Sequence, residues 1–201
     1  MKVAIMLSGM NRSKLNYYIN HKQLIDKYNA DVYISTYNTD KEDGYLSLQE
    51  MMDLYTPKKI EIEKFDNIKP ELDLMSNNIQ WRDYNTLSMF YKIQKTFDLI
   101  EKKYDVYIRM RFDNTFDKYI IEENDFLNIP IQAGHGGFCD QFAFGNYDIM
   151  KEYCHMYDKI PEYLKTGQDF HPETIVKNLN KHLNIKKHDM IFYLNLDLQK
   201  I

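Results

Sequence analysis

Several features that mark common protein classes are missing from this sequence of 201 residues. Its two cysteines, Cys139 and Cys154, are too few for a disulfide framework, so we expect a reducing, cytoplasmic compartment. No apolar run approaches the ~20 residues that span a membrane, and the opening MKVAIMLSGM reads as a strand rather than a secretory signal. The net charge of −4 argues against a protein whose main task is to bind nucleic acid.

Two common nucleotide-binding motifs are also absent. Glycine is scarce, with seven residues, and neither G-x-G-x-x-G nor G-x-x-x-x-G-K-[ST] occurs. The first absence excludes a dinucleotide fingerprint, and the second disfavours a P-loop phosphotransferase. No H-x-x-x-H or H-E-x-x-H spacing is found either, which leaves His21, His155 and His182 as ordinary helix residues.

The sequence does contain an alternation of apolar, strand-like runs and amphipathic, helix-like segments. The pattern predicts strands at 2–8, 30–37, 58–65 and 105–112, separated by helices at 13–28, 45–55 and 83–103. The segment 66–80, which contains Pro70, is expected to be irregular. This order predicts a mostly parallel sheet with right-handed crossover connections.

The second half of the chain has a different character. Short strand-like segments surround a glycine-rich turn at 134–137, and a last strand is expected at 189–196. Helices are predicted at 147–160 and 172–183. We interpret this half as an element appended to the first sheet, with the boundary near Phe116, and not as a separate domain.

The segment YDVYIRMRFDNTFDKY carries charge where a buried strand is expected. Alternation places Tyr107, Arg109 and Arg111 on one face, and guanidinium groups that are partly buried need anions. Asp113 follows at the carboxyl end of the strand, where open α/β sheets bind ligands. An aspartate there suits Mg²⁺ or Mn²⁺ shared with a diphosphate. A structural Arg–Asp pair that closes the strand is the alternative.

Two further strand ends carry polar residues. The first predicted strand leads into Ser8, Gly9 and Arg12, where Gly9 permits close backbone approach and Arg12 can grip a phosphate with two hydrogen bonds. Taken alone, this segment is more typical of an ordinary strand-to-helix turn. Asp140 follows the glycine-rich turn, and it is a candidate general base, a sugar ligand or a turn cap.

Two predicted helices add candidates. Asn85, Ser88 and Lys92 recur at helical spacing and are interpreted mainly as a solvent-facing stripe. His171 and Glu173 lie at the start of another predicted helix. His171 is a candidate metal ligand or phosphate donor and Glu173 a candidate base or acceptor ligand, while helix capping is the simpler role for both.

Three segments together resemble a group of small GT-A glycosyltransferases that occur in large DNA viruses and in bacterial surface-polysaccharide gene clusters. The segments that carry the resemblance are VAIMLSGMNRS, NTLSMFYKIQKTFDLIEKKYDVYIRMRFDNTF and DQFAFGNYDIM. The central motif, Tyr-Asp followed by an apolar run and Arg-x-Arg-x-Asp, is the most specific of them.

The resemblance implies an α/β fold of the Rossmann-like GT-A type, with a mostly parallel sheet flanked by helices and a mixed C-terminal acceptor-side element. One domain would cover 1–201, with a nucleotide-sugar-binding half at 1–116 and an acceptor-side half at 117–201. The implied activity is hexosyl or pentosyl transfer from a nucleoside diphosphate sugar, UDP-sugar favoured, to a glycan hydroxyl, in the cytoplasm or in the host cytoplasm if the protein is viral. A non-catalytic nucleotide- or carbohydrate-binding module is the alternative.

The resemblance also implies roles for the candidate residues. Donor binding would fall to Ser8, Gly9, Arg12, Lys92, Arg109 and Arg111. Asp140 and Glu173 would face the sugar and the acceptor as catalytic candidates, and Asp140 is the preferred base.

A divalent cation, Mn²⁺ or Mg²⁺, is implied as well, with Asp113 and His171 as its ligands. The typical Asp-x-Asp metal motif of the fold reads Arg111-Phe112-Asp113 in this chain, so its first aspartate is absent. Either Asp113 alone anchors the cation, or the arginines replace part of its charge on the diphosphate.

Overall fold

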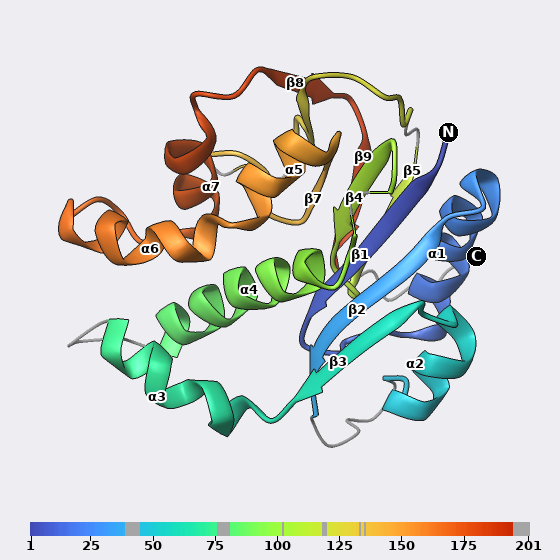
Figure 1. Ribbon diagram of the computed structural model, residues 1–201, viewed down its shortest axis with the longest axis horizontal. Coiled ribbons are helices and arrows are strands. Elements are labelled where there is room, and N and C mark those ends of the chain that lie inside the picture. Colours follow the sequence, from blue (N-terminus) through green and yellow to red (C-terminus); the bar gives the residue numbers. More distant parts are fainter. Residues whose placement is uncertain are drawn as a thin grey trace.

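A seven-stranded sheet forms the centre of the computed structural model, which describes residues 1–38, 45–75, 81–101, 103–117, 120–132, 134 and 136–194. At 71–72, 74–75, 81–83 and 191–194 the backbone alone is described. In spatial order the strands are β3 (Lys59–Glu63), β2 (Asp31–Tyr37), β1 (Val3–Gly9), β4 (Val106–Met110), β7 (Phe142–Gly145), β6 (Leu127–Pro130) and β8 (Ile185–His188) (Figure 1).

Six of these strands run in one direction. The β3, β2, β1 and β4 strands pair in parallel, β7 is antiparallel to both β4 and β6, and β6 pairs in parallel with β8. Two more strands, β5 (Asn114–Asp117) and β9 (Ile191–Leu194), form a separate antiparallel pair. The predicted α/β architecture, a mostly parallel sheet flanked by helices with a mixed C-terminal element, is confirmed by this topology.

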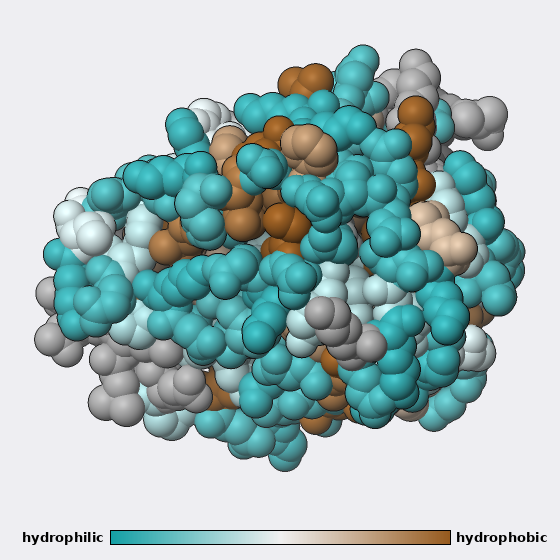
Figure 2. Space-filling model, turned by 45° about the horizontal axis from the view of Figure 1, so that its top comes forward, coloured by the Kyte–Doolittle hydropathy of each residue, from teal (hydrophilic) through white to brown (hydrophobic). Residues whose placement is uncertain are grey.

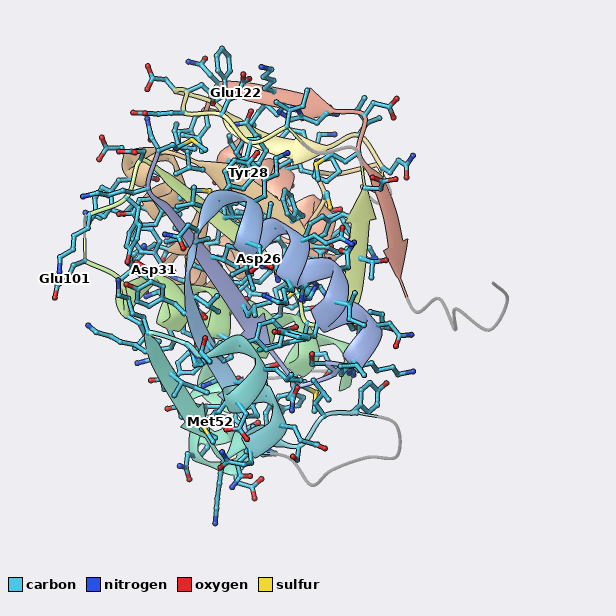
Figure 3. The ribbon with its side chains drawn as sticks, turned by 90° about the vertical axis from the view of Figure 1, so that its right-hand side faces the viewer. Asp26, Tyr28, Asp31, Met52, Glu101 and Glu122 are labelled. Carbon is cyan, nitrogen blue, oxygen red and sulfur yellow. The ribbon has the colours of Figure 1, made fainter. Side chains whose placement is uncertain are left out.

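Helices cover both faces of the sheet. They are α1 (Leu15–Tyr28), α2 (Leu48–Tyr55), α3 (Phe65–Met75), α4 (Trp81–Asp98), α5 (Tyr147–Cys154), α6 (Met156–Lys165) and α7 (Pro172–Asn180). Figure 3 shows α1 and α2 over one face, with Tyr28 at the end of α1 and Met52 in α2. The α4, α5, α6 and α7 helices pack on the opposite face.

The central strand β1 shows why the sheet is buried on both faces. Its Ala4 and Met6 belong to the apolar core beneath α4 to α7, whereas Ile5 and Leu7 belong to the core beneath α1 and α2. All four side chains are fully buried. A strand covered on both faces reads as a continuous apolar run, which is the pattern of the opening residues.

The structure corrects the prediction for 66–80, because α3 occupies Phe65–Met75 with Pro70 inside it. Apolar spacing explains this helix: Phe65 packs against the Tyr37 ring with centroids 5.6 Å apart, and Ile68, three residues later, is 4% exposed. Residues 76–80 lie outside the described part of the chain.

Two predictions for the second half were also wrong in detail. The single helix expected at 147–160 is two helices that meet at His155, whose backbone angles (φ −89°, ψ 25°) are not helical. The last strand expected at 189–196 is shorter in the described residues, since β9 covers Ile191–Leu194, and it pairs with β5 outside the main sheet. The short β5 and β8 strands were not predicted.

The face of the molecule seen in Figure 2 is mainly polar. Hydrophilic side chains cover most of the face shown in Figure 2, and apolar atoms gather in a few separate places. Among the residues that the structure describes, no helix has the length and apolar character needed to cross a membrane.

A buried chain of hydrogen bonds ties α1 and α2 to β5. His21 Nε2 lies 2.7 Å from the carbonyl oxygen of Asn114, and Nδ1 lies 2.8 Å from the Tyr55 hydroxyl. A carbonyl oxygen can only accept, so Nε2 carries the proton and Nδ1 accepts from Tyr55. Burial lowers the pKa of His21 to about 4, despite the opposing effects of the Asn114 hydrogen bond and the Asp113 charge.

We expect this histidine to make the protein less stable in acid. Between about pH 6.5 and pH 4 the unfolded chain binds a proton at His21 and the folded chain does not. The free energy of unfolding therefore falls with decreasing pH in this window, by at most about 1.4 kcal/mol per pH unit from this group. Urea unfolding at pH 7, 5.5 and 4.5 measures the slope.

The matched variants are His21→Gln, which removes the buried titrating group, and His182→Gln, which removes a histidine whose side chain is 55% exposed. The slope should become shallower in the first variant and stay unchanged in the second. Equal slopes for the wild-type protein and His21→Gln would contradict the assignment of a neutral, buried imidazole.

Candidate functional site

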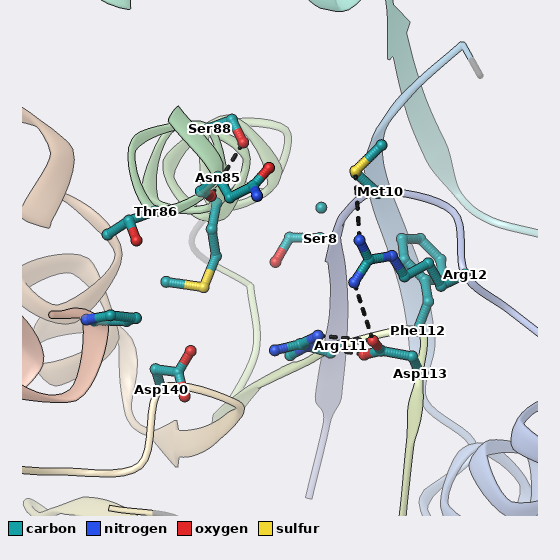
Figure 4. Close-up of a pocket in the computed structure, with 13 residues that line it drawn as sticks. Ser8, Met10, Arg12, Asn85, Thr86, Ser88, Arg111, Phe112, Asp113 and Asp140 are labelled. Carbon is teal, nitrogen blue, oxygen red and sulfur yellow. Dashed lines mark hydrogen bonds and ion pairs between the residues drawn. The ribbon is translucent and has the colours of Figure 1, made fainter. Parts of the chain in front are cut away.

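A cavity of about 210 Å³ opens at the carboxyl edge of the parallel strands. It is lined by Ser8, Gly9, Met10, Arg12, Asn85, Thr86, Ser88, Met89, Arg111, Phe112, Asp113, Asp140 and Pro172 (Figure 4). The β1 and β4 strands end at this edge, and the antiparallel β7 begins there, with Phe142 paired to Met110. This reversed strand brings Asp140, which precedes it, to the same cavity as Arg111.

The end of β1 contributes a hydroxyl group and a glycine. The Ser8 side chain is buried, and its Oγ has no hydrogen-bond partner among the described residues. Gly9 adopts a φ of 110°, which L side chains rarely adopt, and its carbonyl oxygen accepts a hydrogen bond of 2.8 Å from Thr36. The strand end is thereby held in place while the Ser8 hydroxyl remains available to a ligand.

The turn after β4 carries a paired arginine and aspartate. Arg111 Nε and Nη2 donate to the two carboxylate oxygens of Asp113 at 2.8 and 2.7 Å. Burial alone would lower the pKa of Arg111, but these hydrogen bonds and the charge of Asp113 raise it. Arg12, on the other side, places Nη1 3.9 Å from Asp113 Oδ2. Two guanidinium groups therefore converge on one carboxylate at the cavity wall.

Asp140 faces this pair from the second half of the chain. Its main-chain carbonyl accepts a hydrogen bond from Nη1 of Arg109, which is fully buried in the core below. The carboxylate Oδ1 is buried and has no hydrogen-bond partner among the described residues. In the close-up view Arg111 lies between Asp113 and Asp140 (Figure 4), and both carboxylates act on its charge.

The amino-terminal part of α4 forms another wall of the cavity. Asn85, Thr86, Ser88 and Met89 lie there. Asn85 and Ser88 were predicted mainly as solvent-facing residues, and Thr86 and Met89 were not predicted as site residues. The prediction of a solvent-facing stripe is wrong for Ser88, which is 5% exposed. A usable signal was present, because a crossover helix that leads into a parallel strand begins at the carboxyl edge of the sheet, beside the ligand site.

Two predicted donor-binding residues do not reach the cavity. Lys92 is fully buried, with its ammonium 2.5 Å from Glu63 and 3.6 Å from Glu61, and it lies 4.6 Å from the centre of the Tyr37 ring. Its charge is thus used to join α4 to the edge strand β3. Arg109 lies within the sheet, one residue before β4 ends at Met110, and its side chain is fully buried in the core.

His171 and Glu173 stand at the start of α7, on either side of the cavity residue Pro172. His171 Nδ1 lies 2.7 Å from Glu173 Oε2, and the Glu173 side chain is 7% exposed. The Phe138 N–H donates to the Glu173 carbonyl oxygen at 3.0 Å, so the glycine-rich turn rests on this helix end. The two residues are close to the cavity, but neither lines it.

The described residues do not fit a divalent cation. No group of three or more His, Cys, Asp or Glu side chains within the described part of the chain could hold a metal ion. Both oxygens of Asp113 already accept hydrogen bonds from Arg111, and His171 lies against Glu173. Asp113 and His171 therefore do not form a common ligand set in this geometry.

The thiol of Cys139 is not a reactive nucleophile, because burial raises its pKa to about 11.

Comparisons with known proteins add information on the fold. No protein-family model matches the sequence, and no curated protein matches it significantly. The solved structure of CTP:phosphocholine cytidylyltransferase from Streptococcus pneumoniae is similar over 98% of this chain and 95% of that chain, with 13% identity and a TM-score of 0.50. This similarity shows a shared fold.

Two glycosyltransferase structures are similar at a slightly lower level. Mouse xyloside xylosyltransferase 1 matches over 94% of this chain and 84% of that chain, with 9% identity and a TM-score of 0.48. The galactosyltransferase LgtC matches over 93% and 73%, with 10% identity and a TM-score of 0.48. At these identities none of the three structures assigns an activity to the chain.

The glycine-rich turn packs closely against the start of α7 at Gly137. A Cβ atom at Gly137 would overlap the backbone carbonyl of Glu173. We expect Gly137→Ala to lower the free energy of unfolding by about 3 kcal/mol, because backbone and not a flexible side chain must move. Gly136→Ala is the control, since its Cβ meets no atom within 4 Å. In the Gly136→Ala variant the only cost is backbone strain of about 1 kcal/mol, because alanine must adopt the φ of 86°.

Urea unfolding of both variants measures the difference. If Gly137→Ala proved no more destabilising than Gly136→Ala, the close approach of the turn to α7 would be incorrect.

Proposed function

We propose that this protein is a glycosyltransferase that moves a sugar from a nucleoside diphosphate sugar, with UDP-sugar favoured, to a glycan hydroxyl. One observation carries the proposal. Two guanidinium groups and a buried carboxylate, one oxygen of which has no hydrogen-bond partner among the described residues, face the same cavity at the carboxyl edge of the sheet. Such a site can stabilise a departing diphosphate on one side and accept a proton on the other.

The donor would lie along the ends of β1 and β4. Arg12 and Arg111 supply planar N–H donors that match phosphate oxygens, and the Ser8 hydroxyl lies at the same cavity. Gly9 leaves room for the backbone to approach the nucleotide. Hydroxyl and amide groups of Asn85 and Thr86 on the opposite wall suit the hydroxyl groups of a sugar.

The proposed reaction uses these groups as follows. An acceptor hydroxyl attacks the anomeric carbon, the bond from that carbon to the diphosphate oxygen breaks, and the electron pair leaves with the diphosphate. Arg12 and Arg111 stabilise the charge that develops there. The hydroxyl proton passes to the Asp140 carboxylate, whose Oδ1 has no partner among the described residues. Glu173 is the second candidate for this role, but its Oε2 lies against His171.

The base assignment is tested by an isosteric change. Asp140→Asn should slow sugar transfer and acceptor-free donor hydrolysis by about 10² or more, because the amide cannot accept the proton. The Kd for the nucleoside diphosphate should change by less than about threefold, since that part of the ligand contacts Arg12 and Arg111. Hydrolysis of UDP- and GDP-sugars and calorimetric titration with UDP and GDP give the two readouts.

Glu162→Gln serves as the control, because this carboxylate is 76% exposed on α6 and pairs with Lys165. It should keep the wild-type rate. A wild-type rate in Asp140→Asn would remove Asp140 from the mechanism. Binding of a nucleoside diphosphate by the wild-type protein, with no hydrolysis of any sugar donor and no transfer to any glycan, would favour a non-catalytic binding module.

A further inference from the structure

We infer that the cavity binds the donor diphosphate through the guanidinium groups of Arg12 and Arg111 without a divalent cation, and that Asp113 is a positioning residue for Arg111. This inference rests on the proposed function. It decides between the two arrangements that the incomplete Asp-x-Asp motif leaves open, in which either a cation or arginine side chains neutralise the diphosphate.

The contacts of Asp113 are the first evidence for this inference. Its side chain is 4% exposed, and each carboxylate oxygen accepts a hydrogen bond from Arg111, at 2.8 and 2.7 Å. Oδ2 also lies 3.9 Å from Arg12 Nη1. A divalent cation on these oxygens would stand within a few ångströms of two positive groups, and it would compete with the two Arg111 hydrogen bonds for the charge of the carboxylate. The carboxylate is already neutralised.

The N–H groups of Arg12 and Arg111 that remain for a ligand are the second line of evidence. A guanidinium group has five N–H bonds, and Arg111 uses two of them on Asp113, so as far as the described residues show, three remain for a ligand. The Arg12 side chain is 48% exposed, and in the described part of the chain it contacts Asp113 at 3.9 Å and Met10 Sδ at 4.0 Å. Planar arginine donors bind phosphate oxygens in pairs, so these groups can hold a diphosphate directly.

The formal charge of the cavity wall is the third line of evidence. The lining contains two arginines, Arg12 and Arg111, and two aspartates, Asp113 and Asp140, so its formal charge is zero. A divalent cation that binds together with a diphosphate is held by one or two carboxylates and by phosphate oxygens, so those carboxylates must not already be balanced by other positive groups. In this wall Asp113 and Asp140 are balanced by Arg12 and Arg111, and among the described residues no group of three or more His, Cys, Asp or Glu side chains could hold a metal ion.

The decisive experiment compares UDP, GDP, CDP and dTDP binding to the wild-type protein by calorimetric titration, once in EDTA and once in excess Mn²⁺. We expect at least one nucleoside diphosphate to bind in EDTA, with a Kd within about threefold of its value in Mn²⁺. Binding that requires Mn²⁺ would overturn the inference and leave the proposed function intact. Absence of binding in both buffers would overturn the proposed function itself.

Variants at the paired residues sharpen the test. Arg111→Ala should weaken binding in EDTA by about tenfold or more, the usual effect of losing charge-assisted hydrogen bonds. Lys58→Ala changes the net charge equally, but at the far end of β2, where Lys58 pairs with Asp31 at 2.5 Å, and it should have no effect. Wild-type affinity of Arg111→Ala in EDTA would contradict the inference.

Arg111→Asp completes the Asp-x-Asp pattern, and it should lose binding in EDTA and regain part of it in Mn²⁺. Asp113→Asn should weaken binding only modestly, with the same Kd in EDTA and in Mn²⁺, because its effect is exerted through Arg111. A loss of binding in Asp113→Asn that appears only in Mn²⁺ would identify Asp113 as a metal ligand. The wild-type comparison decides the question even if a variant fails to fold.

Discussion

The two hydrogen bonds between Arg111 and Asp113 hold the chain at the point where β4 gives way to β5. Both residues lie beside the cavity, and the Asp113 carboxylate is almost fully buried. Removing one member of such a pair leaves an uncompensated charge, at a cost of about 3–5 kcal/mol. This interaction therefore sets the direction of Arg111, and together with the pairing of β5 with β9 it helps to hold β5 and the wall of the cavity in place.

The pair is supported from behind by neutral polar groups. His21 donates to the carbonyl oxygen of Asn114, the residue next to Asp113, and accepts from Tyr55, which also lies 3.2 Å from Ser13. Each group in this chain has a partner that only one tautomer of the imidazole satisfies. Helices α1 and α2 thus support the end of β4 through hydrogen bonds, in addition to covering the sheet with apolar side chains.

Much of this architecture is readable in the sequence, because strands buried on both faces leave continuous apolar runs and crossover helices leave amphipathic ones. The strand ends at Gly9 and Arg111 and the turn at Asp140 were predicted as site residues on that basis, and the structure brings them to one cavity. Lys92 could not be placed correctly from spacing, because its burial depends on Glu63, which comes from a distant strand.

The same limit explains the other differences between prediction and structure. Arg109 and Arg111 share an alternation pattern, but β4 ends at Met110, so only Arg111 is released toward the cavity. Pro70 is a strong signal against a helix, and it was overridden by the packing of Phe65 on Tyr37 and the burial of Ile68. In each case a tertiary contact outweighed a local preference.

The antiparallel course of β7 has a consequence for how the site keeps its dimensions. Arg111 leaves the carboxyl end of one strand and Asp140 approaches the amino end of its neighbour, and the two strands are joined by the pairing of Met110 with Phe142. A slip of two residues in this ladder would carry Asp140 about 7 Å along the strand from Arg111. The distance between Arg111 and Asp140 is therefore fixed by the register of the main-chain pairing between β4, in the first half of the chain, and β7, in the second half.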